Sequence, residues 1–144
     1  MVYLDGDNNL EGNAIQDFLE MSDVGSNDEI NIVVQFDRSY YYDYTYGNWE
    51  TTKRFHITNG MEPTSENAIM DIGEANMGDP ETLIEFSNWV ISNYSSEKYC
   101  LIFWDHGSGW KSEDNCFTKH VCDAETDMDY LSLEEIRYAL SQIT

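Results

Sequence analysis

The chain has 144 residues, which fits one domain and suffices to bury a hydrophobic core, and 41% of them are hydrophobic, which excludes a disordered chain. Its net charge is −21, from 28 acidic against 7 basic residues, so nucleic acid and anionic membranes are excluded as expected partners. We interpret the acidic surface first as a source of solubility or of adaptation to salt; the alternative is that it attracts cations such as calcium, and peptides rich in lysine and arginine. No apolar run reaches the ~18 residues of a membrane span, and a polar loop from Asp5 argues against a signal peptide.

The first third of the sequence predicts a strand, a helix and a second strand. Residues 1–4 are apolar and stop at the polar turn 5–9, which indicates the end of a strand. Apolar residues at helical spacing then predict a helix over 10–25. Residues 30–36 form a nearly continuous apolar run, which is typical of a strand covered on both faces.

A tyrosine-rich segment at 39–48 is expected to be the tip of a hairpin whose return strand is 51–57. We interpret this tip as a surface ribbon, with substrate binding by its tyrosines as the alternative. Residues 58–79 predict a loop region with a helical turn near 68–72. No repeat, low-complexity segment or linker suggests a second domain.

Clear capping signals mark the two later helices. Asp79 and Pro80 predict the start of a helix that ends near Tyr94, and a capping box at Ser132 and Glu135 opens a final helix. Between them we expect a buried strand at 98–104, a glycine-rich polar loop at 105–110, and irregular chain with a short ribbon at 111–131.

This alternation of strands and helices predicts an α/β fold with a mainly parallel sheet and helices on both faces. Ligands of such sheets bind outside the carboxyl ends of the strands. Three polar clusters occupy predicted strand ends, at 5–11, 37–38 and 105–110. The final helix has no following strand, so we expect the fold to be incomplete at its C-terminal end.

His106 is the main catalytic candidate because it directly follows a predicted buried strand. Imidazole exchanges protons near neutral pH and suits general-base catalysis. Gly107 and Gly109 allow a tight turn that can present backbone N–H groups to a substrate oxygen. The alternative is an ordinary histidine in a glycine turn.

None of the three cysteines is an evident nucleophile for His106. Cys100 lies six residues upstream on the same predicted strand, about 20 Å away, and we expect it in the core. Cys116 and Cys122 lie in irregular chain, where a disulfide between them is possible. With His120 they also form an unusual candidate zinc site, for which His106 is a potential fourth ligand.

A calcium site is the other metal hypothesis. Asp5, Asp7 and Asn9 alternate as at the start of an EF-hand loop. Leu10 replaces the required glycine and Gln16 the closing glutamate, which excludes an EF-hand. A looser carboxylate site remains open.

Four segments in order resemble the clostripain family of cysteine peptidases. Residues 2–11 (VYLDGDNNLE) resemble its opening strand and loop, and residues 30–38 (INIVVQFDR) its second strand. Residues 76–83 (NMGDPETL) are similar to the loop before its next helix, and residues 99–110 (YCLIFWDHGSGW) to its histidine motif. Residues 130–140 again resemble the family's next helix, whereas 111–131 match less well.

The resemblance implies a caspase-like fold, with residues 1–144 as the N-terminal part of a single peptidase domain. It implies a cysteine endopeptidase cleaving after Arg or Lys, with His106 as general base and the Gly107 N–H as oxyanion donor. Asp7, Asn8, Asn9 and Trp110 are candidate substrate-binding residues; the alternatives are that residues 7–9 form a turn that caps the first helix and that Trp110 packs in the core. No cofactor is required for the chemistry, although the family admits calcium, and the resemblance favours a secreted or cell-surface location.

The family's nucleophilic cysteine lies on a strand after the helix matched here by 132–142, so we expect it beyond Thr144. The chain alone is then expected to be inactive, and to associate with the rest of its peptidase or with itself through its open sheet edge. The alternatives are a non-catalytic binding or scaffold module of the same fold and the zinc-binding domain described above.

Overall fold

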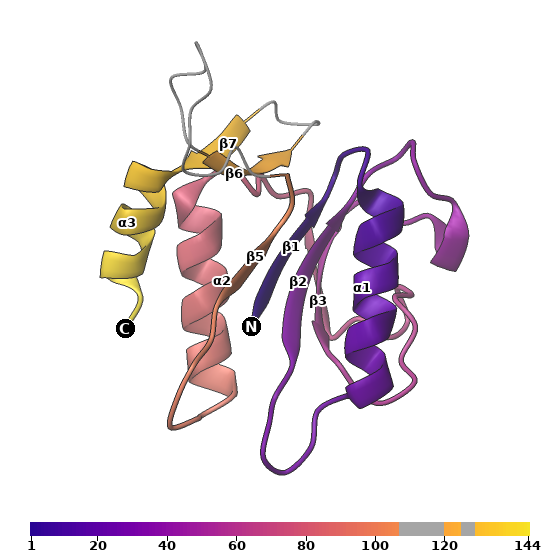
Figure 1. Cartoon of the computed structure of the whole chain (residues 1–144), viewed down its shortest axis with the longest axis horizontal. Coiled ribbons are helices and arrows are strands. Elements are labelled where there is room, and N and C mark those ends of the chain that lie inside the picture. Colours follow the sequence, from indigo (N-terminus) through magenta and orange to yellow (C-terminus); the bar gives the residue numbers. More distant parts are fainter. Residues whose placement is uncertain (107–119, 125–128) are drawn as a thin grey trace.

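The computed structural model describes residues 1–106, the backbone of 120–124, and residues 129–144. Within this part a five-stranded sheet lies between α1 on one face and α2 with α3 on the other (Figure 1). The sheet has the order β4-β3-β2-β1-β5, and β6 and β7 form a separate two-stranded ribbon. The elements are β1 (Val2–Gly6), α1 (Glu11–Val24), β2 (Val33–Arg38), the 3₁₀ turn η1 (Thr45–Gly47), β3 (Thr52–His56), β4 (Met70–Gly73), α2 (Pro80–Asn93), β5 (Ile102–Trp104), β6 (His120–Ala124), β7 (Asp129–Ser132) and α3 (Leu133–Gln142).

The predicted fold class is confirmed, and the sheet is mixed. Strand β1 pairs in parallel with β2 and β5, whereas β3 is antiparallel to both β2 and β4. Four strands therefore run in one direction and β3 runs against them. The reversal arises because β3 follows β2 through a hairpin, which can join only antiparallel strands.

Alternation along the strands builds a core on each face of the sheet. Leu4 and Phe36 are buried toward α1, whereas Tyr3 and Val33 are buried toward α2. The α1 side contains Val2, Leu4, Ala14, Ile15, Phe18, Val34, Phe36, Trp49, Phe55 and Ile57, and the α2 side contains Tyr3, Val33, Met77, Leu83, Phe86, Val90, Leu131 and Ala139. No helix in the described part of the chain has both the length and the apolar character needed to cross a bilayer.

Both predicted helix starts are confirmed. Oδ1 of Asp79 accepts a hydrogen bond from the Glu81 N–H at 2.9 Å, with Pro80 as the first helical residue. Ser132 and Glu135 form the reciprocal capping box of α3.

Replacing Ser132 with alanine should lower the free energy of unfolding by about 1 kcal/mol, because the Glu135 N–H loses its acceptor. Urea denaturation measures this change. Ser141→Ala is the control, because the Ser141 hydroxyl lies at the exposed far end of the helix. Equal losses in the two variants would contradict a role for the cap.

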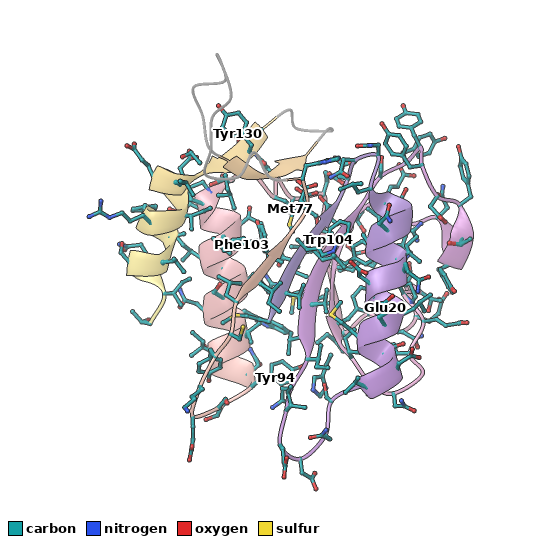
Figure 2. The ribbon with its side chains drawn as sticks, viewed as in Figure 1. Glu20, Met77, Tyr94, Phe103, Trp104 and Tyr130 are labelled. Carbon is teal, nitrogen blue, oxygen red and sulfur yellow. The ribbon has the colours of Figure 1, made fainter. Side chains whose placement is uncertain are left out.

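The predicted buried strand at 98–104 is wrong in extent and exposure. Strand β5 covers only three residues and lies at the edge of the sheet, where Ile102 is 49% exposed. Cys100, expected in the core, precedes the strand and is exposed. Phe103 and Trp104 still pack against the two cores in Figure 2. An apolar run shows that a segment can be covered, but its place in the strand order decides how much is covered within one chain.

The predicted helical turn at 68–72 is also wrong, because these residues contribute to β4. The Ile69 N–H donates to the carbonyl of Arg54 on β3, and the register continues with Met70 opposite Arg54. The hairpin expected between 39 and 57 and the short ribbon expected at 111–131 are both confirmed. The tip at 39–48 exposes Tyr41 and Tyr44. The strands β6 and β7 form the short ribbon expected at 111–131, and β7 extends it to Ser132.

Candidate functional site

The loop after β1 and the residues after β5 meet at the carboxyl edge of the sheet. Strands β1 and β5 are parallel neighbours, with Leu4 opposite Trp104. The segments that follow β1 and β5 therefore leave the sheet at the same edge. The ribbon strand β6 contacts β1 and β5 at this edge, in the upper part of Figure 1.

His106 and Asn9 form the central contact of this edge. Nε2 of His106 lies 2.8 Å from Oδ1 of Asn9, and both side chains are exposed. This contact is a hydrogen bond in the tautomer that carries its proton on Nε2, because an amide oxygen can only accept. In that tautomer Nδ1 has the lone pair that a general base needs.

The side chain of Asn8 bonds the loop after β1 to the segment after β5. Its Nδ2 donates to Oδ1 of Asp105 at 2.7 Å, and its Oδ1 accepts from the Leu10 N–H at 2.8 Å. Asn8 is 1% exposed, so these bonds are made in a desolvated setting. The same side chain therefore fixes the start of α1 and the residue preceding His106.

The predicted site residues separate into three groups. Asn9 lies at His106, whereas Asp7 and Asn8 are buried and hold the loop. Gly107 and Trp110 lie outside the described residues, as do Gly109 and Cys116 and the side chains of His120 and Cys122. Cys100 precedes β5 and is thus at the opposite end of that strand from His106.

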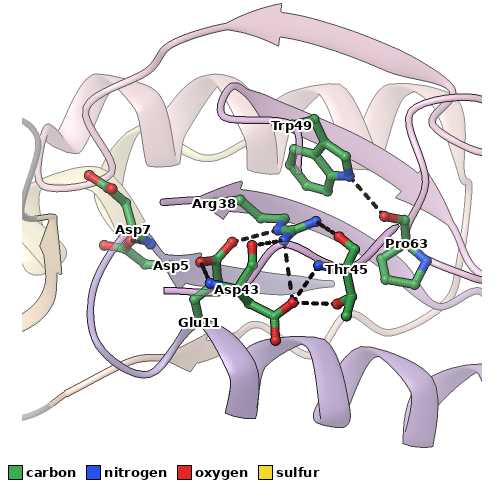
Figure 3. A network of polar contacts seen from close by, with 8 residues as sticks. All are labelled: Asp5, Asp7, Glu11, Arg38, Asp43, Thr45, Trp49 and Pro63. Atoms are coloured by element: carbon green, nitrogen blue, oxygen red, sulfur yellow. Dashed lines mark hydrogen bonds and ion pairs between the residues drawn. The ribbon is translucent and has the colours of Figure 1, made fainter. Parts of the chain in front are cut away.

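A buried ion pair that the sequence analysis missed anchors the tyrosine-rich tip (Figure 3). Nε of Arg38 donates to Oε1 of Glu11 at 2.7 Å, and both side chains are fully buried. The other guanidinium nitrogens donate to the carbonyls of Thr45 and Asp43, and the Asp43 N–H donates to Glu11. Burial outweighs these bonds and raises the pKa of Glu11. The one feature of the sequence that points to this ion pair is Arg38, a charged residue at the end of an apolar strand.

Two tyrosines of this tip line a pocket beside the sheet. The pocket has a volume of about 570 Å³ and is lined by Arg38, Tyr40, Tyr41, Glu50 and Glu74. Because the charge of Arg38 is already paired with Glu11, the tyrosines and carboxylates of the lining suit a cationic guest, which aromatic faces and negative charges both attract.

A carboxylate cluster that could hold a metal lies where β2 and β4 end. One carboxylate oxygen from each of Asp7, Asp37 and Glu74 lies within 4.8 Å of the other two. Asp7 belongs to the looser carboxylate site left open by the sequence, whereas Asn9 instead faces His106. Glu74 was missed because its segment was interpreted as a loop.

Residues 2–144 match the sequence profile of the clostripain family, Peptidase C11. The chain is 32% identical over 162 residues to clostripain of Hathewaya histolytica, covering 99% of this chain and 31% of that protein. It therefore spans about a third of that relative's length.

Two solved cysteine proteases share the fold. A secreted C11 cysteine protease from Bacteroides thetaiotaomicron, bound to an irreversible peptide inhibitor, superposes with a TM-score of 0.66 at 18% identity, over 99% of this chain and 38% of that one. A B. fragilis cysteine protease superposes with a TM-score of 0.59 at 21% identity, over 78% of this chain and 91% of that one. Since the family profile matches almost the whole chain, the chain belongs to the clostripain family of cysteine peptidases.

Proposed function

We propose that this chain supplies the histidine half of the active site of a cysteine endopeptidase that cleaves after Arg or Lys. The contact between His106 and Asn9 carries this proposal, because it orients an exposed imidazole at the carboxyl edge of the sheet. Residues 1–144 then form the N-terminal part of a single peptidase domain, and the nucleophilic cysteine lies beyond Thr144.

The proposed mechanism assigns one step to each group. Nδ1 of His106 takes the proton of the cysteine thiol, and the thiolate attacks the carbonyl carbon of the scissile peptide. The N–H of Gly107 donates to the oxyanion that forms, and the imidazolium returns its proton to the leaving amine. Water then hydrolyses the acyl-enzyme. This chemistry requires no cofactor, and Trp110 and Asn9 border the substrate.

The distribution of charge supports a basic substrate. The described carboxyl edge contains Asp5, Asp7, Asp37 and Glu74, and the chain carries a net charge of −21. Such an edge attracts lysine and arginine side chains and repels acidic peptides.

The open edge of β5 supports association with the remainder of the peptidase. Among the described residues no strand pairs with the outer side of β5, and Ile102 is exposed there. A strand that carried the cysteine along this edge would place its carboxyl end beside His106. Without such a strand, self-association through this edge is the expected result. Because the Bacteroides thetaiotaomicron relative is a secreted protease, we also propose a secreted or cell-surface location.

Peptide substrates that differ only in the residue before the scissile bond test the proposed specificity. The complete peptidase should hydrolyse Arg and Lys substrates at least about 10²-fold faster, in kcat/KM, than Asp or Gln substrates. Equal rates would contradict the specificity. An absence of hydrolysis of every peptide would favour the non-catalytic module.

A further inference from the structure

We propose that the pocket lined by Tyr40, Tyr41 and Glu50 binds the side chain of a lysine or arginine that lies about three residues after the scissile bond of a substrate. This site deepens the peptidase function proposed above and rests on it. The preferred substrates then carry two basic residues, one directly before the scissile bond and one further along on the other side of it.

Three separate segments at the carboxyl edge of the sheet form the walls of the pocket. Tyr40 and Tyr41 follow β2. Glu50 precedes β3, and Glu74 immediately follows β4. Because β3 runs against β2 and β4, its amino end lies at the same edge as their carboxyl ends. The volume of about 570 Å³ is typical of ligand sites and accommodates a lysine or arginine side chain.

The lining attracts a cation rather than an anion. Arg38 contributes to the lining, but its side chain is fully buried and paired with Glu11. Its other guanidinium nitrogens donate to the carbonyls of Asp43 and Thr45, so its charge is turned away from a guest. Glu50 is exposed, and among the described residues no basic side chain pairs with it. A positive guest is therefore drawn to this carboxylate.

Tyr40 and Tyr41 add an aromatic wall. Their ring centroids lie 4.8 Å apart with an interplanar angle of 89°, and the two residues are 51% and 71% exposed. The face of an aromatic ring attracts an ammonium or guanidinium group. The aliphatic part of a lysine or arginine side chain also packs on such rings while its charged end stays hydrated near Glu50.

The walls are held in position before a guest binds (Figure 3). Arg38 anchors the tip by donating to the carbonyl of Asp43 at 2.9 Å. Trp49, the residue before Glu50, is buried, and its Nε1 donates to the carbonyl of Pro63 at 2.8 Å. The Trp49 ring also stacks with the Arg38 guanidinium, whose Cζ lies 5.0 Å from the ring centroid. Such a preformed pocket loses less conformational entropy when it binds a guest.

The strand register places the pocket relative to His106. Leu4 on β1 is opposite Trp104 on β5. Two residues further along, β1 reaches Gly6 and the segment after β5 reaches His106. Arg38 is opposite Gly6 on β2, so His106 and Arg38 lie at the same level on either side of β1. Two strand spacings separate them by about 10 Å, which an extended peptide covers in about three residues.

The proposed reaction decides which part of the substrate reaches the pocket. His106 returns its proton to the leaving amine, so the residue after the scissile bond lies at His106. The proposed cysteine strand lies along the outer side of β5, so the residue before the bond lies on that side. The pocket is on the opposite side of His106, beyond β1. Residues after the bond therefore cross β1 toward β2, and the third of them reaches the pocket.

A series of quenched fluorescent peptides, cleaved by the complete peptidase, tests this inference. Each peptide has arginine before the scissile bond and a single lysine, glutamine or glutamate at one of the five positions after it. Lysine at the third position should raise kcat/KM about tenfold over glutamine, and glutamate should lower it. The gain should shrink in high salt. Mass spectrometry of the products verifies that only the bond after arginine is cleaved.

Variants of exposed lining residues assign the gain to the pocket. Glu50→Gln and Tyr41→Ala should fold normally and should each reduce the ratio of kcat/KM for the lysine and glutamine peptides to about threefold or less. Tyr41→Phe keeps the aromatic ring and should keep the ratio. Glu97→Gln removes the same charge as Glu50→Gln from an exposed residue before β5, at the opposite edge of the sheet, and should also keep the ratio.

The possible outcomes separate the pocket from the peptidase function. Cleavage of the arginine peptides at equal rates with lysine and glutamine would overturn the pocket assignment and leave the peptidase function intact. A lysine preference that persists in both Glu50→Gln and Tyr41→Ala, or that these variants abolish only for lysines before the bond, would overturn it as well. Failure to cleave any arginine peptide would instead refute the peptidase function, and the pocket assignment with it.

Discussion

Replacing His106 with alanine in the complete peptidase should lower kcat/KM by about 10²–10⁴-fold, the usual contribution of a general base. The imidazole is exposed and its hydrogen bond is to the exposed side chain of Asn9, so the free energy of unfolding should change little. Steady-state kinetics on an Arg substrate and urea denaturation together measure the two effects.

His56→Ala is the matched control for this experiment. His56 lies at the end of β3, contacts Asn31 at 3.0 Å and packs against the ring of Tyr94, away from the carboxyl edge. It should retain full activity. Asn9→Ala should give a smaller fall than His106→Ala, because the base remains but its orientation is lost. Full activity of His106→Ala would refute the assignment of the general base.

Replacing Glu11 with alanine should lower the free energy of unfolding by about 3–5 kcal/mol. The change leaves the buried guanidinium of Arg38 without its carboxylate and removes the acceptor for the Asp43 N–H. We expect the tyrosine-rich tip to lose its anchor as well. Chemical denaturation measures the stability, and proteolysis of the tip measures its release.

Glu20→Ala is the matched control, since it removes a carboxylate from the same helix. Glu20 is exposed and accepts a hydrogen bond from the exposed side chain of Gln16, so the loss should stay below about 1 kcal/mol. The double variant Glu11→Leu, Arg38→Met should be more stable than Glu11→Ala, because it leaves no buried charge uncompensated. If the two single variants lost the same stability, burial of the Arg38 pair would not be the cause.

Local signals in the sequence determined the helices and most of the strands. The caps at Asp79 and Ser132 depend on residues two or three positions apart, so they could be predicted directly. The buried strand at β2 and the hairpin after it follow from a continuous apolar run and a polar tip. The position of His106 after a strand was likewise predicted, from the apolar run that precedes it. Because parallel strands present their carboxyl ends at the same edge of a sheet, this also predicted the edge at which His106 lies.

The sequence could not determine how segments from different strands meet. Asn9 and His106 are far apart in the chain and become neighbours only because β1 and β5 pair in parallel. The sequence therefore determined which side chains stand at strand ends, since this depends on local pattern. The tertiary structure alone decided that Glu74 meets Asp7 and Asp37, and that Cys100 is exposed beside an edge strand, because strand order and register depend on contacts between distant segments.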